Sequence, residues 1–300
     1  MTTSTLTELV ITSTAEHAPA LEACMFELGA SSVVFEDAAD QPLLEPPLGT
    51  HPLWSHLVLV ALFPDRVRAE LAAAALQSVE GVLACTTRAV DHQDWVRVGL
   101  ADLGRIHCGG SLWIVPSWES PPEDPEAVCV HLDPGLAFGT GTHPTTALCL
   151  AALAHNPPRQ TDILDYGCGS GVLAIAAMQL GAQAGWAIDI DPQAVLATEH
   201  NATNNGISAD RLSVGLPEHL PAQMQFDVII ANILANPLIE LAPTLTRHAR
   251  PGARLLLAGL LARQAEAVLA AYQPHFALEV VAEREGWVLV EGWRQPSLAG

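Results

Sequence analysis

A glycine-rich run constrains this chain more than any other stretch of the sequence. It reads Asp165-Tyr-Gly-Cys-Gly-Ser-Gly171, follows a short apolar strand-like segment and precedes the apolar run 172–177. Glycines at alternate positions let the backbone turn sharply and approach a ligand closely, because no Cβ atom is in the way. The first turn of a following helix would present unpaired N–H groups that favour a negatively charged ligand group. We therefore predict a strand–loop–helix site that binds a dinucleotide or S-adenosylmethionine.

The spacing of the glycines distinguishes these two ligands. A pyrophosphate-binding loop has the pattern G-x-G-x-x-G, whereas this chain has D-x-G-x-G-x-G. The carboxylate of Asp165 would repel a pyrophosphate but can pair with an ammonium group. A second acid, Asp189, ends the next strand-like segment 24 residues later, close to the place expected for an acid that binds ribose hydroxyls. This combination favours S-adenosylmethionine over an ordinary strand-to-helix turn with capping acids.

The net charge of −20, from 33 acidic and 13 basic residues, limits the classes of partner. Phosphate backbones are bound by clustered Lys and Arg, so we expect no direct binding of nucleic acid. The charge suits a basic protein partner, although a generally acidic proteome would give the same composition. The beginning of the chain lacks the features of a signal peptide, and no apolar run is long enough to span a membrane. Six scattered cysteines with no C-x-x-C pair indicate a reduced, cytoplasmic protein without zinc or another metal.

The length of 300 residues suggests about two domains. The strand-like and helix-like segments of the first part are 6–12, 15–28, 31–35, 56–63, 65–77 and 81–90. Their order, βαββαβ, predicts a ferredoxin-like α+β domain over residues 1–90. We interpret it as a recognition domain, with a purely structural appendage as the alternative. A connecting helix and loop is expected over 91–110, followed by an edge strand over 111–118.

Strand-like and helix-like segments alternate from residue 161 onward. The expected strands are 162–165, 184–190, 211–214, 226–231, 253–259 and 277–294, and the expected helices are 171–180, 192–205, 235–248 and 261–272. This alternation predicts a doubly wound, mostly parallel sheet covered on both faces. In such sheets the ligand binds beyond the carboxyl ends of the strands, where the strand order reverses. Because Asp165, Asp189 and Asn232 all lie at such ends, we expect them in one site.

A second glycine-rich loop, residues 132–146, leads into a helix expected to reach residue 154. Threonine hydroxyls at the start of that helix could hold a carboxylate, and Phe138 could cover an adenine or a sulfonium. An ordinary capped helix is the alternative. His143 is a candidate general base, but a loop or capping role is equally consistent with its position.

Asn232 can present both a carbonyl acceptor and an amide donor to a ligand. In amino-directed methyltransferases, an Asn at this place begins an N-P-P-Y-like turn whose oxygens hold the substrate nitrogen. Here Ile233 and Leu234 follow it, so the aromatic that stacks on a base or planar amide is missing. This departure favours an aliphatic amine over adenine, with an Asn-capped turn as the alternative.

These stretches together resemble the bacterial ribosomal protein methyltransferase family PrmA, whose members modify ribosomal protein L11. The resemblance covers residues 95–293 and is carried by 132–146, 165–176, 188–194, 231–234 and 283–290. The N-terminal domain matches only in its general layout. The hinge segment 94–100 departs from the family, whose linkers carry more charged and aromatic residues.

The resemblance implies a seven-stranded, doubly wound, mostly parallel Rossmann-like methyltransferase sheet over residues 111–300, preceded by the ferredoxin-like domain. It implies that S-adenosylmethionine is bound by Thr146, Gly167, Asp189 and Asn232. To these we add Asp165, Gly169 and Phe138 as further cofactor-binding candidates.

The activity implied is transfer of methyl groups from S-adenosylmethionine to lysine side chains, the N-terminal α-amine or both, of ribosomal protein L11. Our own hypothesis is that the oxygen of Asn232, with nearby backbone carbonyls, orients the amine. We expect a cytoplasmic monomer that binds no membrane. The alternatives are a methyltransferase of another protein or of a small molecule, a nucleotide-dependent dehydrogenase, and a non-catalytic protein that binds S-adenosylmethionine.

Overall fold

The chain forms two compact units, Met1–Val98 and Gly99–Gly300. The computed structural model describes residues 6–39, 53–89, 104–133 and 141–296 of them. None of the helices in these ranges is long and apolar enough to cross a membrane.

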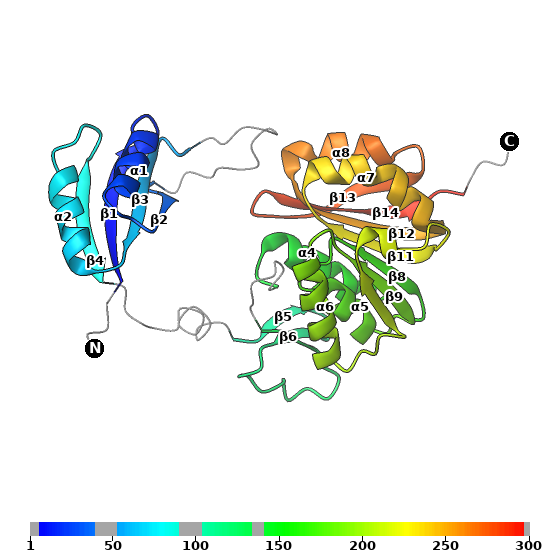
Figure 1. Cartoon of the computed structure of the whole chain (residues 1–300). Coiled ribbons are helices and arrows are strands. Elements are labelled where there is room, and N and C mark those ends of the chain that lie inside the picture. The colour runs from blue at the N-terminus through cyan, green and yellow to red at the C-terminus, as the bar shows by residue number, and fades with distance from the viewer. Residues whose placement is uncertain (1–5, 40–52, 90–103, 134–140, 297–300) are drawn as a thin grey trace. The chain divides into compact units, whose positions relative to one another are not determined.

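In its described residues, the first unit is a four-stranded antiparallel sheet with two helices (Figure 1). Its elements are β1 (Thr7–Thr14), α1 (Ala18–Glu27), β2 (Ser32–Asp37), β3 (His56–Phe63), α2 (Arg66–Leu76) and β4 (Ala84–Ala89). The strand order is β2-β3-β1-β4. Alternate side chains of β1 and β3, such as Leu9 and Leu59, are buried together with apolar side chains of both helices, such as Met25 and Leu76. This period of two is the pattern of a sheet covered on one face.

The second unit contains the large sheet, whose strand order is β10-β9-β8-β11-β12-β14-β13. Its strands are β8 (Asp162–Tyr166), β9 (Ala184–Ile188), β10 (Leu212–Gly215), β11 (Phe226–Asn232), β12 (Ala249–Leu261), β13 (Phe276–Arg284) and β14 (Trp287–Arg294). The pairs from β10 to β12 are parallel, and β14 pairs antiparallel with both β12 and β13. The predicted mostly parallel α/β sheet is therefore confirmed.

Helices cover both faces of this sheet (Figure 1). They are α4 (Pro144–His155), α5 (Val172–Gln179), α6 (Pro192–Asn204), α7 (Ala235–His248) and α8 (Ala265–Tyr272), with short 3-10 helices at Pro217–His219 and Ala262–Gln264. Side chains of α4, α5 and α6 belong to one apolar core and those of α7 and α8 to another. The sheet separates these two cores, so its strands are apolar on both sides, as expected for a doubly wound sheet.

The segment 277–294, expected as one strand, is a hairpin of β13 and β14, and this prediction was wrong. The turn consists of Glu285 and Gly286, whose φ angles are 55° and 79°. Positive φ at both central residues is typical of a two-residue hairpin turn. Strand-like side chains flank the turn closely on both sides, so the sequence pattern looked continuous.

A small second sheet precedes α4 and corrects two further expectations. It contains β5 (Ile106–Gly109), β6 (Leu112–Val115) and β7 (Val128–His131) in the order β5-β6-β7. β5 lies within the stretch 91–110 expected as a connecting helix and loop, of which residues 91–103 lie outside the described ranges. β6 is the central strand and not an edge strand, because β7 returns to pair with it in parallel. That pairing has no local sequence signal.

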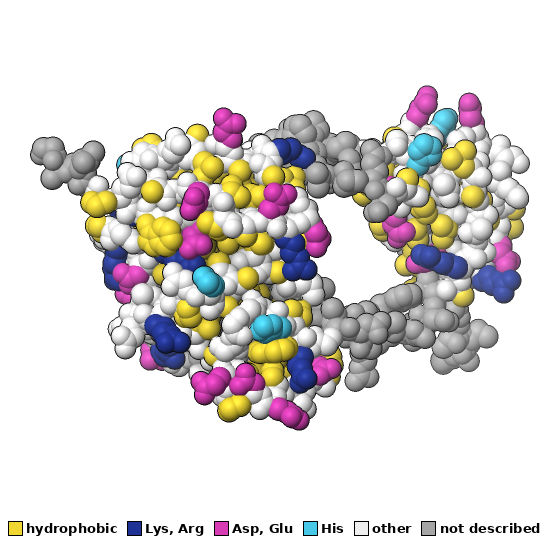
Figure 2. All heavy atoms as spheres, turned by 180° about the vertical axis from the view of Figure 1, so that it is seen from behind, with side chains coloured by type: hydrophobic (Ala, Val, Ile, Leu, Met, Phe, Trp, Pro, Cys, Tyr) yellow, Lys and Arg dark blue, Asp and Glu magenta, His cyan; other side chains and the backbone are white. Residues whose placement is uncertain are grey.

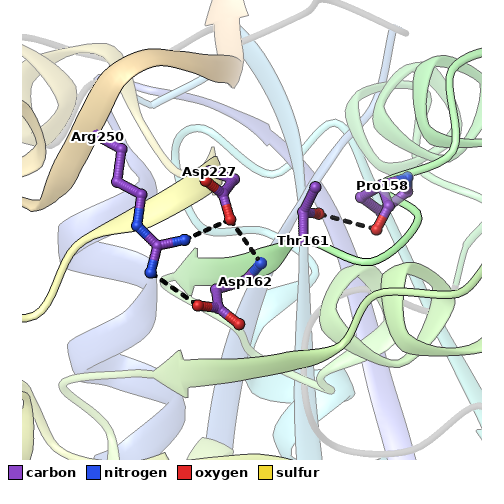
Figure 3. A network of polar contacts seen from close by, with 5 residues as sticks. All are labelled: Pro158, Thr161, Asp162, Asp227 and Arg250. Carbon is purple, nitrogen blue, oxygen red and sulfur yellow. Dashed lines mark hydrogen bonds and ion pairs between the residues drawn. The ribbon is translucent and has the colours of Figure 1, made fainter.

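An ion-pair network joins the amino ends of β8 and β11 (Figure 3). The guanidinium of Arg250 donates to Asp162 at 2.8 Å and also to Asp227. Asp227 in turn accepts a hydrogen bond from the backbone N–H of Asp162 at 2.9 Å. Hydrogen bonds to Asp227 and then Asp162 raise the pKa of Arg250 above its ordinary value. The network holds together the edge of the sheet opposite the carboxyl ends of these strands.

Candidate functional site

The carboxyl ends of β8, β9 and β11 bring three predicted residues to one edge of the sheet. Asp165 is the penultimate residue of β8, Asp189 directly follows β9, and Asn232 ends β11. The chain runs from β8 outward through β9 to β10 and then returns to β11 on the other side of β8. Open α/β sheets bind their ligands at such a reversal of strand order.

The loop between β8 and α5 has the backbone conformation that its glycines permit. Gly167, Gly169 and Gly171 have φ angles of 84°, 56° and 79°, a region that residues with a Cβ atom adopt only with strain. A Cβ atom at Gly171 would lie 2.7 Å from Cγ2 of Thr198 in α6. The N–H of Gly167 donates to the carbonyl of Ile188 at 2.8 Å. The loop is therefore packed tightly against β9 and α6.

Two polar residues of α6 bind the carbonyl groups of this loop, and the sequence reasoning missed both. The Thr198 hydroxyl donates to the carbonyl of Gly169 at 3.0 Å, and the Asn201 amide donates to the carbonyl of Ser170 at 2.8 Å. Thr198 is buried on the same helix face as Ala194 and Ala202. Small residues at a spacing of four predict a helix face that packs closely against backbone, and this signal could have found Thr198.

Asp189 shapes the glycine loop in addition to its predicted role. Its Oδ2 accepts a hydrogen bond from the N–H of Gly169 at 2.9 Å, and its Oδ1 accepts one from the N–H of Asp191 at 3.0 Å. A carboxylate has about four lone-pair positions, so each oxygen can accept a second hydrogen bond. Asp189 can therefore bind ligand hydroxyls while it holds the loop.

Asp165 is fully buried, and only one of its two oxygens has a partner among the described residues. Oδ2 accepts a hydrogen bond from the N–H of Ala174 at 3.0 Å, whereas Oδ1 has no partner among the described residues. Burial raises the pKa of Asp165 to about 7; the bond from Ala174 opposes this rise, and the Asp189 carboxylate adds to it. A buried acceptor without a donor is unfavourable by roughly 1–3 kcal/mol. A cationic ligand group beside Oδ1 would remove that penalty.

Asn232 and Thr146 contact each other across the site. Nδ2 of Asn232 donates to the hydroxyl oxygen of Thr146 at 3.3 Å. Oδ1 of Asn232 is buried and has no partner among the residues that the structure describes. Thr146 lies in the first turn of α4 and is fully buried. The backbone N–H groups of such a turn favour negatively charged ligand groups.

His143 caps α4. Its Nδ1 accepts a hydrogen bond from the N–H of Thr145 at 3.3 Å and lies 2.7 Å from the hydroxyl of that residue. The ring packs edge-on against Trp287 at a centroid distance of 5.3 Å. Burial lowers the pKa of His143, with a weaker opposing effect from Glu285. These contacts support the capping alternative over a general base. The remaining predicted ligand residue, Phe138, lies outside the described ranges.

The residues present fit the chemical groups of S-adenosylmethionine. Asp165 offers a carboxylate for an ammonium group, Asp189 offers acceptors for ribose hydroxyls, and the N-terminus of α4 suits a carboxylate. Asn232 leaves an amide oxygen for a further donor, such as an incoming amine. In the described ranges, no group of three or more His, Cys, Asp or Glu side chains is arranged to hold a metal ion.

Comparison with known proteins gives a match that spans both units. The model of the ribosomal protein L11 methyltransferase (PrmA) family matches residues 5–295. The ribosomal protein L11 methyltransferase of Pseudomonas aeruginosa is 51% identical over 284 residues, which are 94% of this chain and 96% of that protein. The protein of the same name from Pseudomonas putida is 49% identical over 282 residues, which are 93% of this chain and 96% of that protein.

A solved structure is similar to the larger part of the chain. The ribosomal protein L11 methylase of Lactobacillus delbrueckii subsp. bulgaricus superimposes with a TM-score of 0.57 at 31% sequence identity. The superposition covers 65% of this chain and 100% of that chain.

Proposed function

This chain belongs to the ribosomal protein L11 methyltransferase family, and from that premise we propose that it transfers methyl groups from S-adenosylmethionine to amino groups of ribosomal protein L11. The amines are lysine side chains, the N-terminal α-amine, or both. The observation that carries the proposal is a pair of buried oxygens, Oδ1 of Asp165 and Oδ1 of Asn232, that lack donors among the described residues. They belong to neighbouring strands, β8 and β11. One suits the ammonium of the methyl donor and the other suits the amine that accepts the methyl group.

The methyl donor is proposed to bind along the carboxyl edge of the sheet. Asp165 pairs with its ammonium group, and Asp189 accepts from its ribose hydroxyls. Gly167 and Gly169 permit the loop backbone to lie close to the bound methyl donor. Thr146, with the N-terminus of α4, holds the carboxylate, and Phe138 covers the adenine or the sulfonium. When bound, the donor supplies a sulfonium-activated methyl group.

Asn232 is proposed to orient the acceptor amine. Because its Nδ2 is engaged with Thr146, Oδ1 is the atom left to accept a hydrogen bond from the amine. An amine must lose a proton before it can attack, and desolvation in the site lowers an amine's pKa. The protein's main contribution is then to align the nitrogen with the methyl carbon. His143 serves as the cap of α4 and is not needed as a base.

The first unit is proposed to be a ferredoxin-like recognition domain for the protein substrate. The element order βαββαβ and the strand order β2-β3-β1-β4 support this. We place the recognition domain at residues 1–90 and the methyltransferase domain at 111–300. Of the stretch 91–110 expected as a linker, Ile106–Gly109 form β5, which pairs with β6 and belongs with the second domain.

A basic ribosomal protein is a suitable partner for a chain of net charge −20. Figure 2 shows acidic side chains on the visible face of each unit, among arginines and without a broad basic patch. We propose that the enzyme acts in the cytoplasm as a monomer, with no direct binding of nucleic acid or membrane.

The substrate assignment is tested by incubating the protein with labelled S-adenosylmethionine and the purified proteins of the large ribosomal subunit. The chain contains no lysine, because all 13 basic residues are arginine. Any labelled lysine must therefore come from a substrate. We expect label on ribosomal protein L11, and label only on another protein would overturn the assignment. Calorimetry with S-adenosylmethionine and NAD tests the donor separately, and binding of NAD alone would contradict it.

A further inference from the structure

We propose that Ile233 is a positioning residue. Its Cγ2 methyl group sets the distance between the amide of Asn232 and the donor loop, by which we mean the glycine loop 167–171 between β8 and α5. This inference rests on the proposed function and deepens it, since it names a residue that acts on the alignment of the two reactants through its contacts with the loop and with Asn232. Ile233 follows Asn232 in the chain, and its side chain packs against the apolar core on the α7 and α8 side of the sheet.

The first contact is between Ile233 and the donor loop. A Cβ atom at Gly167 would lie 2.3 Å from Cγ2 of Ile233 and 3.8 Å from its Cβ. Real Cβ atoms essentially never approach another heavy atom that closely, so the methyl group occupies the space where any other residue at 167 would begin its side chain. The loop backbone and this one methyl group are therefore in direct contact.

The second contact is between Ile233 and β12. A Cβ atom at Gly259 would lie 2.3 Å from the carbonyl oxygen of Ile233 and 2.9 Å from its nitrogen. The preceding residue of β12, Ala258, is in register with Asn232. The backbone of Ile233 thus packs directly against the buried strand β12. This contact prevents it from moving away from the donor loop.

Together the two contacts fix the distance between the loop at Gly167 and the end of β11 that carries Asn232. The backbone of Ile233 is held by β12, and its Cγ2 methyl group holds the loop at Gly167. Asn232 is one peptide unit away and is held in addition by Thr146. Methyl transfer needs the nitrogen and the methyl carbon in close alignment, and a displacement of about 1 Å can reduce such a rate about a hundredfold. The β-branch of Ile233 is therefore expected to matter more than its total volume.

Two substitutions of Ile233 distinguish the effect of its β-branch from the effect of its side-chain volume. Ile233→Val keeps both the β-branch and Cγ2 but loses a methyl group, whereas Ile233→Leu keeps the number of carbon atoms but loses Cγ2. If Ile233 only filled space, the Leu variant would resemble the wild type more closely than the Val variant would. If Cγ2 sets the spacing, the order is reversed. The same pair of substitutions at Ile239, another partly buried residue against the same core, provides the matched control.

The rate of a single turnover is measured on the full chain with saturating S-adenosylmethionine and ribosomal protein L11. We expect Ile233→Val to retain the rate within about threefold and Ile233→Leu to lower it at least tenfold. The KM for ribosomal protein L11 and the affinity for S-adenosylmethionine should stay within about threefold in both variants. The two Ile239 variants should keep the wild-type rate.

A Leu variant as fast as the Val variant, or a loss explained wholly by weaker donor binding, would overturn the inference. Thermal unfolding of each variant checks that it is folded. If Ile233→Leu does not fold, Ile233→Ala is used in its place, because it removes the same methyl group without adding a new branch. An unchanged rate in the Ala variant would also overturn the inference. Failure of the wild-type protein to methylate ribosomal protein L11 in the same assay would instead refute the proposed function, so the two failures are distinguishable.

Discussion

The side-chain amide nitrogen of Asn232 lies 3.3 Å from the hydroxyl oxygen of Thr146, a residue 86 positions earlier in the chain. This contact joins the end of β11 to the first turn of α4. Because the nitrogen is the atom engaged, the amide oxygen, which has no partner among the described residues, is left to accept a hydrogen bond. A single hydrogen bond thus decides which end of the Asn232 amide is available to an amine.

Replacement of Thr146 tests that relationship. Thr146→Val removes the hydroxyl at nearly constant shape and leaves the Asn232 amide without its partner, so both orientations of the amide become accessible. We expect kcat at saturating S-adenosylmethionine to fall about tenfold, which corresponds to the roughly 1–2 kcal/mol of one buried hydrogen bond. Thr146→Ser keeps the hydroxyl and should retain most of the activity. A Val variant with the wild-type kcat would show that the contact does not orient Asn232.

The buried carboxyl group of Asp165 predicts how donor binding depends on pH. Its pKa in the protein is about 7, and its ordinary value is 3.8. An ammonium group at Oδ1 favours the ionised carboxylate, so affinity for S-adenosylmethionine should rise with pH, roughly tenfold between pH 5.5 and 7. Calorimetry across this range measures the effect. In Asp165→Asn the affinity should be weaker and nearly independent of pH, and an unchanged pH dependence in that variant would assign the titration to another group.

The carboxyl group of Asp165 also makes the stability of the ligand-free protein depend on pH. Here the effect of rising pH is unfavourable, whereas it favours donor binding. Because the folded state holds the Asp165 proton more tightly than the unfolded chain does, its contribution to stability decreases as the pH rises from about 4 to about 7. Asp165→Asn cannot ionise and should lack this decrease. Thermal unfolding of the two proteins at pH 5 and pH 7 compares them, and parallel changes in Tm would contradict the assignment.

The network around Arg250 predicts a loss of stability without a loss of function. Arg250→Met removes both ion pairs at the amino ends of β8 and β11 (Figure 3). The Arg250 side chain is 40% exposed, so solvent screening limits the expected cost to about 1 kcal/mol. This corresponds to a decrease in Tm of about 2–4 °C for a domain of this size. The affinity for S-adenosylmethionine should not change, since Asp165 lies at the other end of β8.

The hairpin turn between β13 and β14 offers a stabilising substitution. Glu285 has a φ of 55°, a conformation that Asn adopts more readily than Glu. Its ion pair with Arg284 is exposed and contributes little. We expect Glu285→Asn to raise stability by about 0.5 kcal/mol, and Gly286→Ala, at a φ of 79°, to lower it by about 1 kcal/mol. Urea unfolding measures both, and a less stable Asn variant would show that Glu285 makes a contact that outweighs its backbone strain.

Local patterns predicted most elements of the large sheet because each strand and helix there carries its own signal. Helix α7 begins and ends where its apolar spacing indicated, and the strand ends placed Asp165, Asp189 and Asn232 correctly at one edge. The hairpin at Glu285 and the parallel return of β7 to β6 were missed. The hairpin turn contains Glu285, a residue type that is uncommon at positive φ. The strands β6 and β7 pair although a 12-residue loop separates them in the chain.

The partners of the supporting residues could not be predicted from local patterns, even where, as for Thr198, the helix spacing marks the residue itself as closely packed. Thr198 and Ile233 act on glycines that are distant in sequence. Their roles depend on how helices and loops pack in three dimensions, and a single sequence gives no distance between such positions. The hydrogen bond between Asp189 and Gly169 is a further example, because it depends on the conformation of the loop, which the sequence does not give.

The central claim is that the edge formed by β8, β9 and β11 transfers methyl groups from S-adenosylmethionine to amines of ribosomal protein L11. Peptide mapping by mass spectrometry of ribosomal protein L11, after incubation with the wild-type protein or with Asn232→Ala, tests it most directly. The account predicts methyl groups on lysine side chains or on the α-amine, only in the presence of S-adenosylmethionine, and at a rate about a hundredfold lower with the variant. Unmodified ribosomal protein L11 with an enzyme that binds the donor, or methyl groups on a side-chain amide instead of an amine, would contradict it.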